Sequence, residues 1–157
     1  MRARTHILFS VLCLLFYIDY FKVKNILLFG FLLFFATLFP DIDEAGSTIG
    51  KKTQPFSNMI NIICGHRGVF HSLLLPCATM LTLLFFKQTE SGIAIFIGYI
   101  SHLVMDMITP AGIYLLYPFS FKIRGPIPVN SFFEKILFWT LVFIIIIKLL
   151  VSGAVLL

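Results

Sequence analysis

Four histidines and three aspartates stand at the ends of apolar segments in this sequence. They are His6, His66, His71, His102, Asp41, Asp43 and Asp106. Polar and ionisable side chains are costly at membrane depth, so those that persist there usually serve a function. Imidazole and carboxylate groups are also common ligands of divalent metal ions. These seven residues would form a site only if the fold brings them together.

Two pairs within this set have informative spacing. His102 and Asp106 are four residues apart, which places them one turn apart on one helix face, where both can bind one cation. A buried His–Asp hydrogen bond is the alternative, but the apolar surroundings favour function. Asp41 and Asp43 put two carboxylates side by side, and these repel each other unless a cation or a proton neutralises one. A solvated helix end is the alternative there.

His66 and Arg67 are bracketed by Gly65 and Gly68, which allow an unusual backbone. His71 follows at the start of the next apolar segment. An interfacial loop with long side chains reaching toward water would explain Arg67 but explains His71 poorly. The group is therefore interpreted as part of the site.

The composition indicates a chain whose solvent is lipid. It is 59% hydrophobic and 12% charged, with 19 phenylalanines and a mean hydropathy of +1.01. The net charge of +5 comes from lysines and arginines scattered between apolar runs, which suggests contact with anionic headgroups. No basic run with interleaved aromatic residues suggests nucleic-acid binding. Three unpatterned cysteines are interpreted as packed small hydrophobic residues.

Five apolar segments predict an all-α, polytopic membrane helix bundle in a single integral membrane domain over residues 1–157. We expect transmembrane helices at about 5–21, 24–39, 69–86, 92–109 and 132–157. The first resembles a signal peptide, but no A-x-A cleavage site follows, so we expect it to be retained. Pro76 should kink the third helix. Ser131 and Glu134 read as a capping box that starts the fifth, with Glu134 a cap and not a catalyst.

The basic residues orient the bundle. With the N-terminus inside, the inner side carries Arg2, Arg4, Lys51, Lys52, Arg67, Lys122, Arg124 and Lys135, and the outer side carries Lys22, Lys24 and Lys87. Counting spans then brings all seven candidate ligands to the cytoplasmic face. Asp19 falls at the opposite face and should not join them.

Seven ligands exceed the need of one ion. They suit Zn²⁺, with Mn²⁺ or Fe²⁺ as alternatives, in a site of two ions bridged by a carboxylate, with room for a third. Paired metals about 3.5–4 Å apart hydrolyse phosphoesters by activating water. Arg67 can hold a phosphate in a bidentate way.

Read together, the motifs resemble the YdjM-like family of membrane-bound metal-dependent hydrolases. The matching stretches are Thr5-His6, Pro40-Asp41-Ile42-Asp43 with Ser47 and Gly50, Gly65-His66-Arg67-Gly68, His71-Ser72-Leu73-Leu74, Gly98-Tyr99-Ile100-Ser101-His102 leading to Asp106, Thr109-Pro110-Ala111-Gly112 and Leu115-Leu116-Tyr117-Pro118. More remotely, the family is similar to the zinc-dependent phospholipase C and single-strand nuclease superfamily. The resemblance implies metal-dependent phosphoester hydrolysis on a phospholipase C-like bundle, with His6, Asp41 or Asp43, His66, His71, His102 and Asp106 as ligands.

The sequence thus predicts a hydrolase of the cytoplasmic (inner) membrane that acts on lipid or other headgroup-level phosphoesters through a metal-bound hydroxide. One of Asp41 and Asp43 would bind metal and the other would orient water, while Arg67 would bind phosphate. Membrane lipids are the expected partners. A metal-ion transporter and a non-catalytic metal-binding membrane protein are the main alternatives. A di-iron oxidase would need more histidines, and a bis-histidine haem protein would need them deeper in the bundle.

Overall fold

The computed structural model describes residues 1–43, 69–119 and 121–155. In these ranges the chain forms five α-helices, which are α1 (Ala3–Tyr20), α2 (Ile26–Leu38), α4 (Leu74–Phe85), α5 (Thr89–Met107) and α6 (Phe132–Val155). Two short 3-10 helices, η1 (Phe39–Asp43) and η2 (Val69–His71), precede and follow the segment that is not described. The only β pairing in the described ranges is one antiparallel bridge between Ile113 and Ile123. The prediction of an all-α fold is confirmed.

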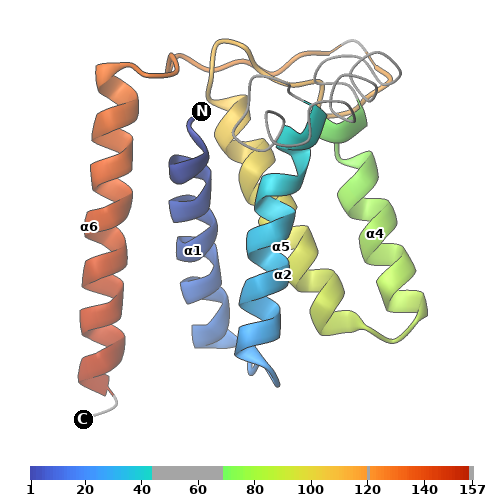
Figure 1. Cartoon of the computed structure of the whole chain (residues 1–157), viewed down its shortest axis with the longest axis vertical. Coiled ribbons are helices and arrows are strands. Elements are labelled where there is room, and N and C mark those ends of the chain that lie inside the picture. The colour runs from blue at the N-terminus through green and yellow to red at the C-terminus, as the bar shows by residue number, and fades with distance from the viewer. Residues whose placement is uncertain (44–68, 120, 156–157) are drawn as a thin grey trace.

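The helices lie side by side, and α5 is the element that most of the others contact. It packs against α1, α2 and α4, whereas α6 packs against α1 at the edge of the bundle (Figure 1). The N-terminus, η1, η2, the end of α5 and the start of α6 all lie at the same end, which Figure 1 places at the top. We call this the η end of the bundle.

Helix α4, which follows the segment that is not described, begins later than predicted. Residues Val69–His71 form η2, and α4 starts at Leu74. Pro76 therefore lies in the first turn of α4, where its missing N–H would have no helical partner in any case. The kink expected from Pro76 just past His71 takes the form of a break, because residues 72–73 separate η2 from α4. The fourth predicted helix begins earlier than expected, at Thr89 instead of 92.

Two helices in the described part of the chain are long and apolar enough to cross a membrane, over Ala3–Tyr20 and Phe132–Ser152. Ile26–Ile42 and Leu74–Phe85 are apolar but shorter. On α6, large apolar side chains such as Trp139, Phe143 and Leu150 are exposed, as expected of a surface that contacts lipid. The five-span topology and the remote likeness to phospholipase C stay predictions.

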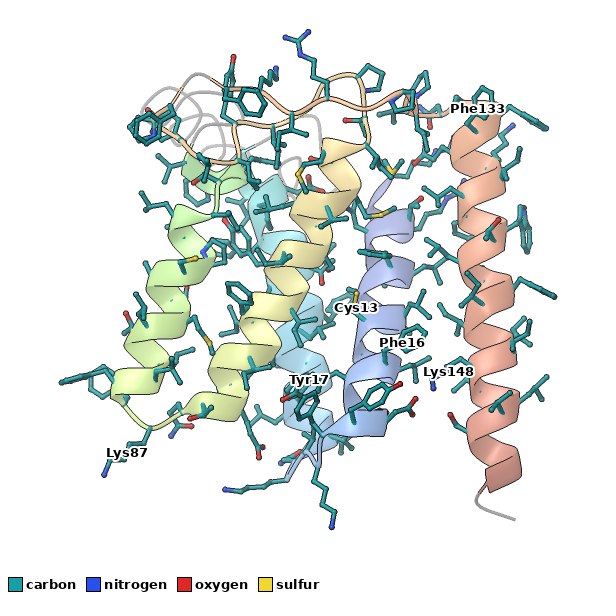
Figure 2. The ribbon with its side chains drawn as sticks, turned by 180° about the vertical axis from the view of Figure 1, so that it is seen from behind. Cys13, Phe16, Tyr17, Lys87, Phe133 and Lys148 are labelled. Atoms are coloured by element: carbon teal, nitrogen blue, oxygen red, sulfur yellow. The ribbon has the colours of Figure 1, made fainter. Side chains whose placement is uncertain are left out.

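At the end away from η1, α6 is joined to α1 by a charged side chain. Lys148 forms an ion pair with Asp19, and its Nζ lies 5.1 Å from the centroid of the Phe16 ring. Figure 2 shows Lys148 directed from α6 toward α1, beside Phe16. As predicted, Asp19 takes no part in the histidine cluster.

Candidate metal centre

Five of the seven predicted ligands converge at the η end of the bundle. His6 comes from the first turns of α1, Asp41 from η1, His71 from η2, and His102 and Asp106 from the end of α5. The three histidines and Asp106 are at most 1% exposed, and Asp41 is 9% exposed. Segments far apart in the sequence thus deliver imidazole and carboxylate groups to one buried place.

Asp106 is the centre of this cluster. Its Oδ1 lies 3.4 Å from His6 Nε2, and its Oδ2 lies 3.4 Å from His71 Nε2 and 3.6 Å from His102 Nε2. The Met1 nitrogen also lies 3.0 Å from Oδ1. His102 Nε2 is 3.7 Å from Asp41 Oδ1, which connects the second carboxylate to the first.

A backbone carbonyl fixes the orientation of His102. The carbonyl oxygen of Thr37 lies 2.7 Å from His102 Nδ1, so Nδ1 must carry the proton and donate it. Thr37 belongs to the last turn of α2, where carbonyls have no helical N–H partner and can accept from elsewhere. The consequence is that Nε2 keeps its lone pair and points into the cluster. Metal-binding histidines are commonly oriented in this way.

The close approach of α2 to α5 depends on Gly98. A Cβ atom at this position would lie 2.2 Å from the Leu33 carbonyl oxygen and 3.1 Å from the Ala36 Cβ. On α2, Thr37 lies one turn after Leu33 and on the same face. On α5, His102 lies one turn after Gly98 and on the same face. A side chain at position 98 would therefore push α5 away from the carbonyl that orients His102.

Glu134 holds the start of α1, and with it His6. It is buried, its Oε1 accepts from the Arg2 N–H at 2.7 Å and from the Thr5 hydroxyl at 3.3 Å, and its own N–H donates to Ser131 Oγ at 3.2 Å. The last contact confirms the predicted cap at the start of α6. The other two extend the role of Glu134, because they tie α6 to Arg2 and Thr5, which precede His6 at the start of α1.

The segment after α5 closes the base of the site through backbone contacts. The Thr109 hydroxyl donates to the Asp106 carbonyl at 2.8 Å, and the Gly125 N–H donates to the Thr109 carbonyl at 3.0 Å. A Cβ atom at Gly125 would lie 2.4 Å from the Ile108 Cα, so this return of the chain requires glycine. The end of α5 is therefore held in place from both sides.

The cluster fits a divalent cation by charge. Two buried carboxylates, Asp41 and Asp106, face histidines that are neutral when they act as ligands. The Met1 ammonium lies 3.0 Å from Asp106 Oδ1, and a divalent ion would supply further positive charge to these buried carboxylates. In the described part of the chain, His6 Nδ1 and His102 Nε2 are buried and have no hydrogen-bond partner. Bound metal would satisfy the second of these.

The spacing of the ligand atoms also fits. Metal–ligand bonds of about 2.0–2.1 Å in a tetrahedral zinc site separate neighbouring ligand atoms by roughly 3.4 Å. Three separations around Asp106 are 3.4, 3.4 and 3.6 Å. Two sets have ligand atoms within 4.8 Å of one another, namely His6 with His102 and Asp106, and Asp41 with His71 and His102. Because His102 offers one free nitrogen, it can serve only one ion at a time.

The remaining predicted site residues lie outside the described part of the chain. These are His66 and Arg67, and the side chain of Asp43, whose backbone belongs to η1. Sequence reasoning missed the role of Thr37, because a backbone carbonyl leaves no mark in residue type. It also missed the contacts of Glu134 with α1, although an acidic residue near the start of an apolar helix was a visible signal.

Comparison with known proteins gives a consistent family. Residues 1–156 match the family described as YdjM inner membrane protein. The inner membrane proteins YdjM of Escherichia coli (strain K12) and Shigella flexneri are each 34% identical over 146 residues, which covers 81% of this chain and 70% of each relative. The YvsG protein of Bacillus subtilis (strain 168) is 35% identical over 106 residues, covering 63% of this chain and 64% of that protein. No solved structure matches. The chain belongs to the YdjM family of inner membrane proteins.

Proposed function

We propose that the chain is a metal-dependent hydrolase of the inner membrane, a phosphoesterase that acts at headgroup level. The observation that carries the proposal is the convergence of three histidines and two carboxylates from four separate segments around buried Asp106. A cluster of this kind is costly to bury without a cation, and metal-assisted hydrolysis is a chemistry that such ligands serve.

The proposed ligands of one ion, Zn²⁺ by donor type, are His71, His102, Asp41 and Oδ2 of Asp106. His6 approaches the other oxygen of Asp106, so these two residues would help to hold a second ion. A second or third ion would draw on Asp43, whose side chain is not described, and on His66, which lies outside the described residues. A bound ion would supply a nucleophile at neutral pH and charge stabilisation for the phosphoester oxygens.

Asp41 provides the proposed access to the site. Its side chain keeps 12% exposure, whereas those of His71, His102 and Asp106 keep 2% or less. A group at the edge of a buried cluster can contact both a ligand and water, so Asp41 is placed to accept a proton from an attacking water or to orient it. Arg67 and Asp43 retain their proposed roles in phosphate binding and water orientation.

The site is proposed to face the cytoplasm in a multi-pass topology. Arg2, Arg4, Lys122, Arg124 and Lys135 belong to segments at the η end, and Lys22, Lys24 and Lys87 belong to turns at the other end. An excess of basic residues marks the cytoplasmic side. A site at that level would meet lipid headgroups, so lipid phosphoesters are the proposed substrates.

The test compares wild-type protein with His102→Ala in lipid nanodiscs. Elemental analysis should find zinc or another divalent metal in the wild type, and mass spectrometry should detect hydrolysis of added phospholipids. His102→Ala should lose both, whereas Asp19→Asn, at the far end of α1, should keep both. Retention of metal and hydrolysis in His102→Ala would falsify the proposal.

One observation favours a second candidate, a non-catalytic metal-binding membrane protein. Four protein ligands around one ion, nearly all fully buried, are typical of closed structural zinc sites, whereas catalytic sites keep one position open. Stoichiometric metal without hydrolysis of any phosphoester, together with a large loss of thermal stability on chelation, would support this reading.

A further inference from the structure

An apolar groove lies beside the metal centre, between α2, α4 and α5. Its volume is about 530 Å³, and its lining includes Leu32, Phe35, Phe39, Ile42, Leu75 and Ile95. This volume lies within the range of about 300–1,000 Å³ that is usual for small-molecule sites. The groove is therefore large enough for a ligand and not a packing defect between helices.

Residues of the groove lining are close neighbours in the chain of the candidate metal ligands. Ile42 directly follows Asp41, and Tyr99, which also lines the groove, is one turn before His102 on α5. The Tyr99 hydroxyl donates to the Phe70 carbonyl at 2.7 Å, next to His71. A ligand in the groove would consequently have one end at the cluster.

The polar groups in the lining are already used within the protein. Tyr99 and Thr79 carry its two hydroxyls, and Thr79 donates to the Leu75 carbonyl just as Tyr99 donates to Phe70. The lining thus directs no side-chain hydroxyl toward a sugar or a headgroup. It favours an aliphatic chain, which has no hydrogen-bonding group that the apolar lining would leave unpaired.

The depth of the groove matches one leaflet. Ile42 and Leu32 are ten positions apart (42 − 32 = 10) along η1 and α2, which corresponds to about 15 Å at a helical rise of about 1.5 Å per residue. The hydrocarbon core of a bilayer is about 30 Å thick, so the groove extends about as far as a lipid chain from the same leaflet. Beyond Leu32 the next pocket is lined by polar residues, including Lys24 and Lys87.

We propose that this groove holds one acyl chain of a membrane lipid whose phosphoester headgroup lies at the metal centre. The inference rests on the proposed function and specifies its substrate class: a phosphoester with a long aliphatic chain on the same molecule. The groove binds the chain whether or not metal is present, because no lining residue belongs to the ligand set. Substrate choice would then depend on chain length as well as on the headgroup.

The experiment uses the full chain in nanodiscs, stripped of metal with a chelator. The probe is phosphatidylglycerol with a photoreactive diazirine near the middle of one acyl chain, and labelled peptides are mapped by mass spectrometry. We expect labelling of α2, α4 and α5 at groove residues well above that of exposed Trp139 and Phe143 on α6. Equal labelling of α6 and the groove would mean ordinary lipid contact and would overturn the inference.

Two threonines on α4 provide a matched pair. Thr79 lines the groove and Thr82 does not, yet each hydroxyl donates to the carbonyl four residues earlier. Thr79→Trp should lower groove labelling severalfold, because the indole ring would occupy the space of the chain. Thr82→Trp should leave it unchanged. A second pair covers the case in which Thr79→Trp fails to fold. Phe35 lines the groove and its neighbour Phe34 does not, and both are exposed, so Phe35→Ala is compared with Phe34→Ala.

Activity of metal-loaded protein separates this inference from the proposed function. If both are right, long-chain substrates are preferred, and Thr79→Trp shifts the preference toward short chains without lowering metal content. Hydrolysis with no chain-length preference and no groove labelling would refute the acyl-chain site and would leave the proposed phosphoesterase activity supported. Groove labelling without any hydrolysis would support the chain site and refute the phosphoesterase.

Discussion

The two ends of the bundle both place carboxylates in apolar helices, but they neutralise them differently. At the far end, Asp19 pairs with Lys148, and their side chains remain 30% and 19% exposed. At the η end, Asp41 and Asp106 are surrounded by His6, His71 and His102. A lysine brings its own positive charge, whereas a neutral imidazole brings a lone pair. The first arrangement pairs one charge with one charge. In the second, the Met1 ammonium contacts Asp106 Oδ1 at 3.0 Å, and the imidazole lone pairs suit an added cation.

A second polar feature at the far end supports this contrast. Glu90 accepts from the Lys24 N–H at 3.2 Å, and the pocket around them also contains Lys87. There each acidic residue has a basic one nearby and retains contact with water. Buried histidines around carboxylates, as at the η end, are typical of metal sites, whereas a lysine beside a partly exposed carboxylate is typical of a structural ion pair.

The largest effect should come from the central carboxylate. Asp106→Asn removes the charge and half of the ligand oxygens from the point where all three histidines meet. Mutation of outer residues of metal sites costs about 10–100-fold in affinity, so the loss here should exceed about 100-fold. Calorimetric titration of the metal-free protein with metal measures this loss of affinity. Asp19→Asn is the matched control at the other end of the bundle. Equal metal affinities in the two variants would show that Asp106 is not a metal ligand.

The next effect should come from the glycine at the helix contact. Gly98→Ala places a methyl group against the Leu33 carbonyl and shifts His102 from Thr37, so metal affinity should fall about 10–100-fold. Gly30→Ala, whose Cβ would lie 3.8 Å from Leu14, should keep metal affinity and gain up to about 1 kcal/mol of stability. Calorimetric titration with thermal melts checks both. Unchanged metal affinity in Gly98→Ala would show that the close contact of Gly98 with Leu33 does not orient His102.

A moderate effect is expected where α6 holds α1. Glu134→Gln turns one acceptor into a donor facing backbone N–H groups, which should cost about 1–3 kcal/mol and weaken metal binding through His6. Ser131→Ala removes only the helix cap, at about 1 kcal/mol, and should leave metal binding intact. Chemical denaturation in detergent and metal titration separate the two. If both variants bound metal equally well, Glu134 would be a cap alone.

The smallest effect should come from the ion pair at the far end. The double substitution Asp19→Asn with Lys148→Gln should change stability by no more than about 1 kcal/mol, as expected for a partly exposed pair. Metal content should stay at the wild-type level, since no ligand is involved. A loss of metal in this variant would show that the two ends of the bundle are not independent.

Much of the site follows from patterns along the chain. Apolar runs locate the helices, and the alternation of short and long connections puts His6, Asp41, His71, His102 and Asp106 at one end. The structure brings these five residues together. The starts of helices were less predictable. The start of α4, for example, follows a hydrogen bond from the Leu73 N–H to the Leu115 carbonyl, which joins segments distant in sequence.

The sequence by itself determined which residue types reach the η end, because helix spans and side-chain periodicity are local properties. Tertiary structure alone decided that Asp106 is the centre, that the Thr37 carbonyl orients His102, and that Glu134 holds α1. These depend on distances between helices, which Gly98 and Gly125 set through close backbone approach. A backbone carbonyl and an interhelical separation have no residue type of their own, so only the packed chain can assign them.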